Sequence, residues 1–155
     1  MTGADPSPAA ALARGLAAGA AGTAAMTAAQ TAYYRVTGGE PSDTPAQVGR
    51  RIVEGVLRRE VPDERMPLLN QLMHWLYGTS WGGLYGIVAG HRGRGPGGGM
   101  ALAAVVWATS VVELPALGVA PPVWEYDPAT LASDVGFHAV YGITVSVAHA
   151  ALAPS

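Results

Sequence analysis

The sequence contains no cysteine and no lysine, and few charged residues of any kind. Without cysteine the chain has no disulfide, thiolate metal site or cysteine nucleophile. Nine arginines and eleven acidic residues leave a net charge of −2, which gives no basic footprint for nucleic acid. Charged residues make up 13% of the chain, about half the usual share of a soluble domain, whereas 50% of residues are hydrophobic. This balance predicts a membrane protein whose main partner is the lipid bilayer.

Uncharged stretches predict where the chain crosses the membrane. A helix needs roughly 20 apolar residues to span about 30 Å of hydrocarbon, because its backbone groups must bond within the segment. Residues 66–90 form the cleanest stretch, since none of these 25 residues carries a formal charge. In the third stretch, Pro115 is expected to kink the helix or end it early. The predicted spans cover about residues 15–35, 66–90, 100–120 and 135–153.

Residues 37–65 hold most of the charge and predict a short amphipathic helix at about 45–59. Its apolar residues, among them Ile52 and Val56, recur at helical spacing opposite several arginines, which suits a helix lying on the membrane surface. A solvated helix that caps the bundle is the alternative. The predicted fold is one all-α membrane domain over residues 1–155, with four transmembrane helices and this surface helix.

A short motif, His-x-x-Tyr-Gly, occurs at residues 74–78 and again at 138–142, an offset of 64 residues. Both copies would lie in the second helix of a hairpin, as expected for two hairpins related by an axis along the membrane normal. Three matching positions are few, so duplication and coincidence both stay open.

Small residues recur at helical spacing along the predicted spans. Glycines repeat every four residues in the second span, and a stripe of this kind lets a neighbouring backbone approach closely. Such faces pack inside the chain or against another subunit, which favours a homo-oligomer or a membrane partner subunit. The glycines predicted to pack are Gly15, Gly19, Gly78, Gly82, Gly86, Gly90 and Gly142.

His74, His138 and Glu113 lie inside the predicted spans, where an ionisable side chain is costly to expose to lipid. They are therefore expected to face protein or a water-filled cavity. In one interpretation they line a proton or cation path, since histidine exchanges protons near neutral pH. In the other, they are neutral groups that hydrogen-bond between helices. Gln30, Tyr77 and Tyr141 are the supporting polar residues.

These residues favour two classes of function. The first is a channel-like or transporter-like module with a polar path, and the second is a non-catalytic scaffold or partner-binding subunit. The sequence lacks the His-Glu-x-x-His, Gly-x-Ser-x-Gly and P-loop motifs. It therefore predicts no enzyme, metal site or cofactor.

One segment also carries a family resemblance. Residues 114–123 read Pro-x-x-Gly-x-x-Pro-Pro-Val after a leucine, and a helix with His138 near its start follows an acidic loop. This pattern resembles the YagU-like family of small bacterial inner-membrane proteins, and residues 74–85 are similar to that family's central helix. The resemblance implies a multi-pass protein of the bacterial inner (plasma) membrane, with a poorly defined activity and no catalytic residue. The absence of lysine also indicates a GC-rich bacterial source.

Overall fold

The computed structural model describes residues 7–89 and 95–153. Within these residues the chain is all helical and contains no strand, which confirms the predicted all-α class with five helices. Two single turns of 3-10 helix, Asp63–Arg65 and Val123–Glu125, lie in the connections. The five helices are α1 (Pro8–Thr37), α2 (Thr44–Leu57), α3 (Met66–Ala89), α4 (Pro96–Ala116) and α5 (Pro128–Ala151).

Two helix ends differ from the predicted ranges for clear local reasons. Helix α5 begins at Pro128 rather than near residue 135, because the Asp127 carboxylate accepts hydrogen bonds from the backbone N–H groups of Ala129 and Thr130, each at 3.0 Å. Hydrogen bonds from Thr130 also hold the pKa of Asp127 below its usual value. Helix α4 ends one residue after Pro115, as expected for an early stop.

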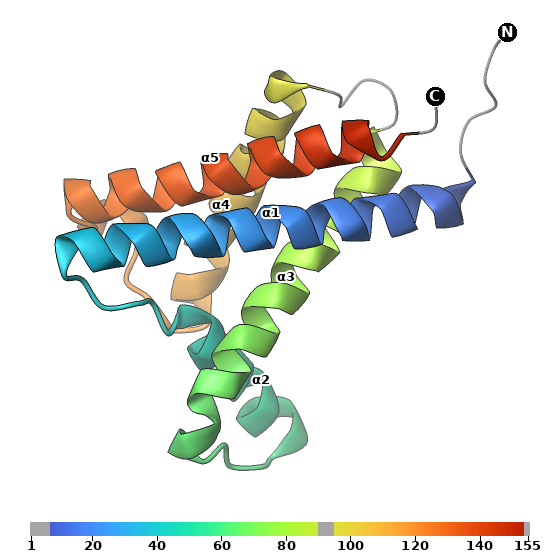
Figure 1. The fold of residues 1–155 in the computed structure, drawn as a ribbon. Coiled ribbons are helices and arrows are strands. Elements are labelled where there is room, and N and C mark those ends of the chain that lie inside the picture. The colour runs from blue at the N-terminus through green and yellow to red at the C-terminus, as the bar shows by residue number, and fades with distance from the viewer. Residues whose placement is uncertain (1–6, 90–94, 154–155) are drawn as a thin grey trace, which may run out of the picture.

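Figure 1 shows α1 and α5 running antiparallel and side by side, with α3 and α4 crossing them steeply. Helix α1 packs against both α3 and α5, α4 packs against α5, and α2 packs against α3. Helices α3 and α4 hardly touch. The chain therefore forms two crossed pairs that are joined through α1 and α5.

The glycine stripes of α1 and α3 face one another inside the chain. A Cβ built on Gly19 would lie 2.9 Å from the carbonyl oxygen of Gly78 and 2.9 Å from the Cα of Gly82. A Cβ on Gly86 would lie 2.7 Å from the Cα of Gly15. Both are closer than real side chains approach, so only glycine permits this crossing.

A second crossing joins α4 to α5. A Cβ on Gly99 would lie 2.7 Å from the carbonyl oxygen of Gly142, and one on Gly142 would lie 2.8 Å from the backbone nitrogen of Ala103. Because these small faces are used within one chain, they give no further support to the expected homo-oligomer, which stays a prediction. Gly90 lies outside the described residues.

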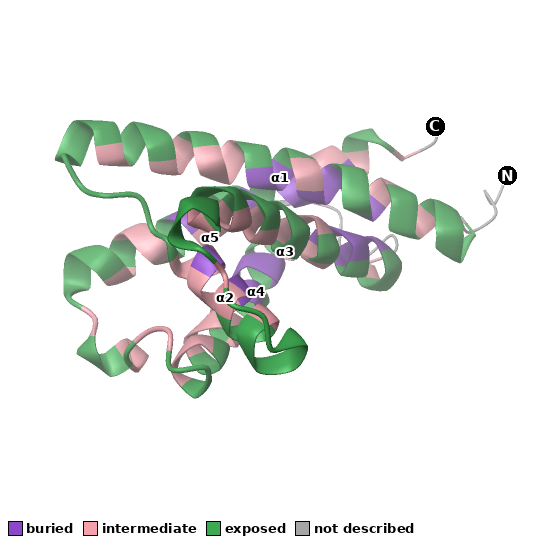
Figure 2. Ribbon diagram, turned by 90° about the horizontal axis from the view of Figure 1, so that it is seen from below, coloured by how far each residue is buried: buried purple, intermediate pink, exposed green. Residues whose placement is uncertain are grey.

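Buried residues gather where the helices cross, while the outer faces are exposed (Figure 2). By length and composition, two of the described helices could cross a membrane: Gly97–Ala116 within α4, and α5. Helix α1 is rich in alanine, and the first turns of α3 carry Asn70 and Gln71, which lower their apolar character. The core cluster consists of Ala18, Tyr85, Leu102, Val106, Tyr141 and Val145.

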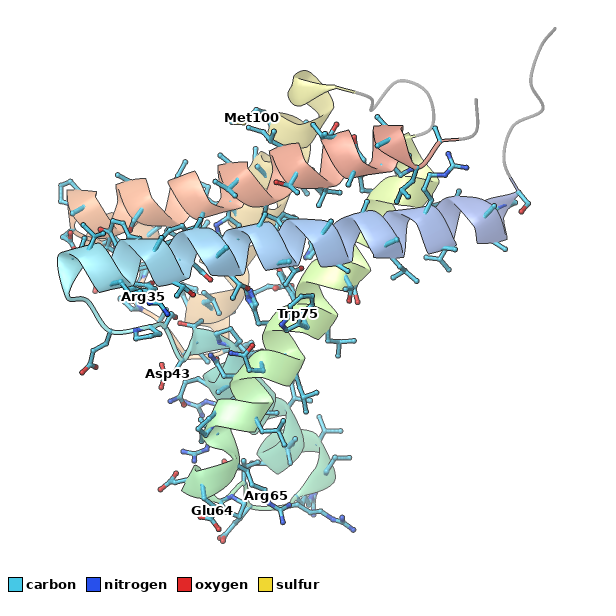
Figure 3. All side chains as sticks on the ribbon, in the orientation of Figure 1. Arg35, Asp43, Glu64, Arg65, Trp75 and Met100 are labelled. Carbon is cyan, nitrogen blue, oxygen red and sulfur yellow. The ribbon has the colours of Figure 1, made fainter. Side chains whose placement is uncertain are left out.

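Helix α2 packs against α3 through its smallest residues. Ala46 is fully buried, and a Cβ on Gly49 would lie 2.8 Å from the Met73 side chain. The Asn70 side chain accepts a hydrogen bond from the Ala46 N–H and donates one to the Ser42 carbonyl, which fixes the start of α2. The apolar residues Ile52, Val56 and Leu57 stay exposed. Figure 3 places Glu64 and Arg65 at the same end of the molecule as α2, and Met100 at the opposite end.

We expect Gly82→Ala to destabilise the protein by about 1 to 3 kcal/mol, because the added methyl group must push α1 and α3 apart. Gly136→Ala is the matched control, since a Cβ on this residue of α5 meets no atom within 4 Å. Unfolding in mixed detergent and SDS micelles, followed by circular dichroism, measures both variants. Equal stability of the two would contradict the close approach of α1 and α3.

Candidate functional site

A cavity of about 990 Å³ lies at the end of the bundle that carries α2. Its walls come from the second half of α1, the first half of α3, the second half of α4 and the first half of α5. The segment between α1 and α2 covers one side, with Ser42 and Pro45 on the wall. All six polar residues singled out from the sequence lie on this cavity: Gln30, His74, Tyr77, Glu113, His138 and Tyr141.

The hydrogen bonds of His74 define its tautomer. Its Nε2 lies 3.1 Å from the Thr27 hydroxyl oxygen. The Thr27 hydroxyl proton is already donated to the Thr23 carbonyl at 2.8 Å. Because a hydroxyl has one proton, Thr27 can only accept from the ring, and the neutral His74 ring therefore carries its proton on Nε2. The Nδ1 atom keeps its lone pair.

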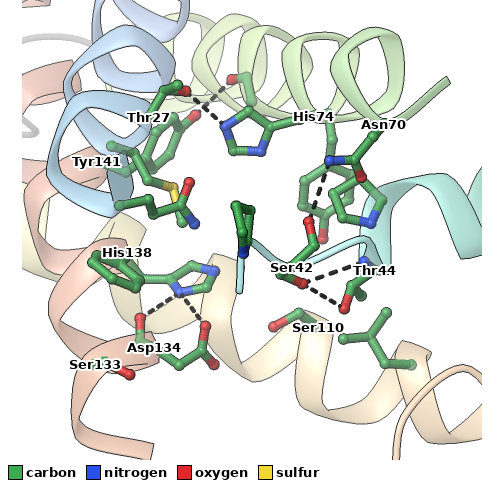
Figure 4. A pocket seen from close by; sticks show the side chains of 18 of the residues that line it. Thr27, Ser42, Thr44, Asn70, His74, Ser110, Ser133, Asp134, His138 and Tyr141 are labelled. Carbon is green, nitrogen blue, oxygen red and sulfur yellow. Dashed lines mark hydrogen bonds and ion pairs between the residues drawn. The ribbon is translucent and has the colours of Figure 1, made fainter. Parts of the chain in front are cut away.

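His138 has the opposite tautomer. Its Nδ1 lies 2.8 Å from the backbone carbonyl oxygen of Asp134, one helical turn earlier, and 3.4 Å from the Asp134 carboxylate. Since a carbonyl only accepts, Nδ1 is protonated, and in the neutral ring Nε2 then carries the lone pair. Figure 4 shows the two rings on opposite walls of the cavity, with Nε2 of His138 turned away from Asp134.

Two tyrosines tie the helices together around the cavity. The Tyr141 hydroxyl donates to the carbonyl of Gly78 at 2.6 Å, so a residue of the second His-x-x-Tyr-Gly copy bonds directly to the first. The Tyr77 hydroxyl donates to the Glu113 carboxylate at 3.4 Å and links α3 to α4. The two copies of the motif therefore meet in space, at the floor and wall of one cavity.

The cavity is closed toward the other end of the bundle. There the core cluster fills the space, and the Tyr85 hydroxyl donates to Ser146 at 3.1 Å. His149 is 2% exposed and packs edge-on against the Tyr85 ring at 5.4 Å. The described lining of the cavity therefore does not continue past the core cluster to the other end of the bundle.

Carboxylates outnumber fixed positive charges on the cavity wall. Within the described residues the lining includes one arginine, Arg35, which is exposed in the last turn of α1. Burial, together with the Asp134 carboxylate, raises the pKa of Tyr126 above its usual value. The lining carboxylates are Glu113, Glu125, Asp127 and Asp134.

Asp134 is the main site residue that sequence reasoning missed. Its carboxylate accepts a hydrogen bond from the Trp107 indole N–H at 2.9 Å and lies beside His138. The sequence signal was its position four residues before His138, on the same helix face. It was missed because α5 was expected to begin only after this charge.

No group of three or more histidine, aspartate or glutamate side chains within residues 7–89 and 95–153 is arranged to hold a metal ion. Comparisons with protein-family models, curated proteins and solved structures found no match. The resemblance to the YagU-like family stays a prediction.

We expect the two histidines to show opposite tautomers when neutral, with the proton on Nε2 in His74 and on Nδ1 in His138. Nitrogen-15 chemical shifts of the labelled rings at alkaline pH measure this directly. Thr27→Val should allow His74 to populate both tautomers, because it removes the acceptor of the Nε2 proton. The tautomer of His138 should stay the same. Identical ring shifts for both histidines in the wild-type protein would contradict the assignment.

Proposed function

We propose that this chain is a multi-pass membrane protein whose cavity serves a transporter-like function. In this proposal α1, α3, α4 and α5 all cross the membrane, and α2 lies at its surface in a bacterial inner membrane. The carrying observation is that His74, His138 and Glu113, from three different helices, converge on one cavity. Such a cavity is the expected place for ionisable residues within membrane spans.

The exposed side chains support a lipid environment. Large apolar residues are exposed along the outer faces of the crossing helices, for example Leu72 and Leu76 on α3, and Ile143 and Val147 on α5. Contiguous apolar surface on this scale is unusual for a soluble monomer, whereas lipid would cover it. On α2, the exposed apolar residues lie beside arginines, as in a helix at the membrane interface.

The scaffold alternative also has a specific basis. His74, Glu113 and His138 each have a hydrogen-bond partner: Thr27 for His74, Tyr77 for Glu113, and the Asp134 carbonyl for His138. Two of these bonds join different helices, and interhelical bonds of this kind contribute about 0.6 kcal/mol on average. In a scaffold, removing them would lower stability and leave no transport to lose.

Flux driven by a pH gradient in proteoliposomes separates the two proposals. We expect wild-type protein to dissipate the gradient when an external cation is supplied, and the His74→Ala/His138→Ala variant to fall to the rate of protein-free vesicles. Glu113→Gln should lower the flux as well. Glu60→Gln is its matched control, because Glu60 is exposed and lies outside the cavity.

Each variant is compared at equal incorporation and after its helical content has been checked by circular dichroism. Wild-type flux at the rate of protein-free vesicles would refute the transporter proposal and favour the scaffold.

A further inference from the structure

We propose that the cavity binds an organic cation, that is, an amine or quaternary ammonium-like ion with an apolar body. This inference rests on the transporter-like function proposed above and names the chemical class of its ligand. Three features of the cavity carry it: the excess of carboxylates, the aromatic rings, and a large volume without a metal-ligating cluster among the described residues.

The charged side chains of the cavity wall indicate that the ligand is positively charged. Among the described residues the wall carries four carboxylates against one arginine; Arg35 and three of the carboxylates are exposed, and Asp134 is half-buried. In their neutral forms, the rings of His74 and His138 each carry one unprotonated nitrogen and add no fixed positive charge to the wall. Clefts lined by one sign of charge concentrate ions of the opposite sign. A cation is therefore attracted and an anion repelled.

Of the two cavity carboxylates that lie within the crossing helices, Glu113 and Asp134, Glu113 is the one better placed to meet a ligand. It is exposed at the cavity wall, and its hydrogen bond from Tyr77 is long, at 3.4 Å. Asp134, in contrast, is held by Trp107 at 2.9 Å and lies beside His138. Asp127 is engaged in capping α5. Most of the lone pairs of the Glu113 carboxylate are therefore available to accept hydrogen bonds or to pair with a cation.

Aromatic rings favour a cation that is not a bare metal ion. Rings on α1, α3, α5 and the segment before α5 contribute to one wall surface, and the Tyr34 and Phe137 rings lie 6.1 Å apart. Aromatic faces attract organic cations, and such cages are a known way to bind quaternary ammonium groups. The aromatic residues of the lining are Tyr34, Tyr77, Tyr126, Phe137 and Tyr141.

Size and donor set agree with this class of ligand. A volume of about 990 Å³ is at the upper end of the range for pockets that hold drug-sized molecules, and far larger than an inorganic ion needs. No cluster of three metal-ligating side chains occurs in the part of the chain that the structure describes. The cavity therefore fits a bulky ion better than a dehydrated metal ion.

Binding to the full-length protein in detergent tests the inference without any flux. Tetraphenylphosphonium and tetraphenylborate have nearly the same shape and opposite charge, so isothermal titration with each, corrected for empty micelles, isolates the effect of charge. We expect saturable binding of the phosphonium and at least about tenfold weaker binding of the borate, since each carboxylate within reach attracts one and repels the other. Equal binding of both ions, or binding of neither, would overturn the inference.

Substitutions then locate the bound cation. Glu113→Gln should weaken phosphonium binding by about tenfold, because it removes the charge with little change in side-chain volume. Glu60→Gln should bind like the wild type. If the phosphonium binds equally well to all three proteins, it does not lie beside Glu113 and the proposed site is wrong. Thermal unfolding of each variant shows that the fold is retained before binding is measured.

The outcome is distinct from that of the proteoliposome assay. Flux that depends on His74 and His138, together with no phosphonium binding, would leave the transporter-like function standing and refute the ligand class. Saturable phosphonium binding with no flux would keep the ligand class and refute transport, leaving a cation-binding membrane protein.

Discussion

The close approach of α1 to α3 determines the shape of the molecule. Straight helices that touch at one point separate on either side of it, and the glycine contact here lies in the first half of α1 and the second half of α3. The remaining halves therefore diverge toward the end that carries α2. Because no large side chain can enter the crossing, Gly82 and its neighbours also fix where this divergence begins. The cavity is the space that the divergence leaves.

The second pair of helices follows the same plan. Helices α4 and α5 touch at Gly99 and Gly142, and they too separate toward the cavity. In both copies of the repeated motif the histidine precedes the glycine by four residues, one turn along the same face. At that turn, in both copies, the histidine lies on the cavity wall. The motif thus has a physical meaning, whether the two hairpins arose by duplication or not.

Much of this arrangement is readable from the sequence, because lipid-compatible helices require long uncharged stretches and close crossings require small residues. Helix α3 at residues 66–89 follows from such a pattern, and so does the part of α1 within the predicted span 15–35, whereas the first turns of α1, from Pro8 to Arg14, were not predicted. The start of α5 does not follow from such a pattern. Asp134 interrupts the uncharged stretch, yet it lies inside the helix, where its carboxylate accepts a hydrogen bond from Trp107.

Contacts between segments that lie far apart in the chain also could not be predicted from the sequence. The covering of the cavity by the segment before α2 depends on Asn70, whose side chain bonds to both Ser42 and Ala46. The closed end depends on Tyr85 meeting Ser146, 61 residues away. Neither Asn70 nor Tyr85 stands out from the sequence of its own helix. Only the packed structure therefore shows which residues they bond to.

The cavity itself bears on the choice between a transporter and a scaffold. Interhelical hydrogen bonds need no empty space, and a bundle whose polar groups served only as links would gain dispersion energy by filling the gap with larger side chains. Instead, the walls carry threonine and serine in several places that face the space, such as Thr27 and Ser110. Keeping a volume of about 990 Å³ open costs packing contacts at every wall residue. That cost is easiest to understand if a ligand occupies the space during function.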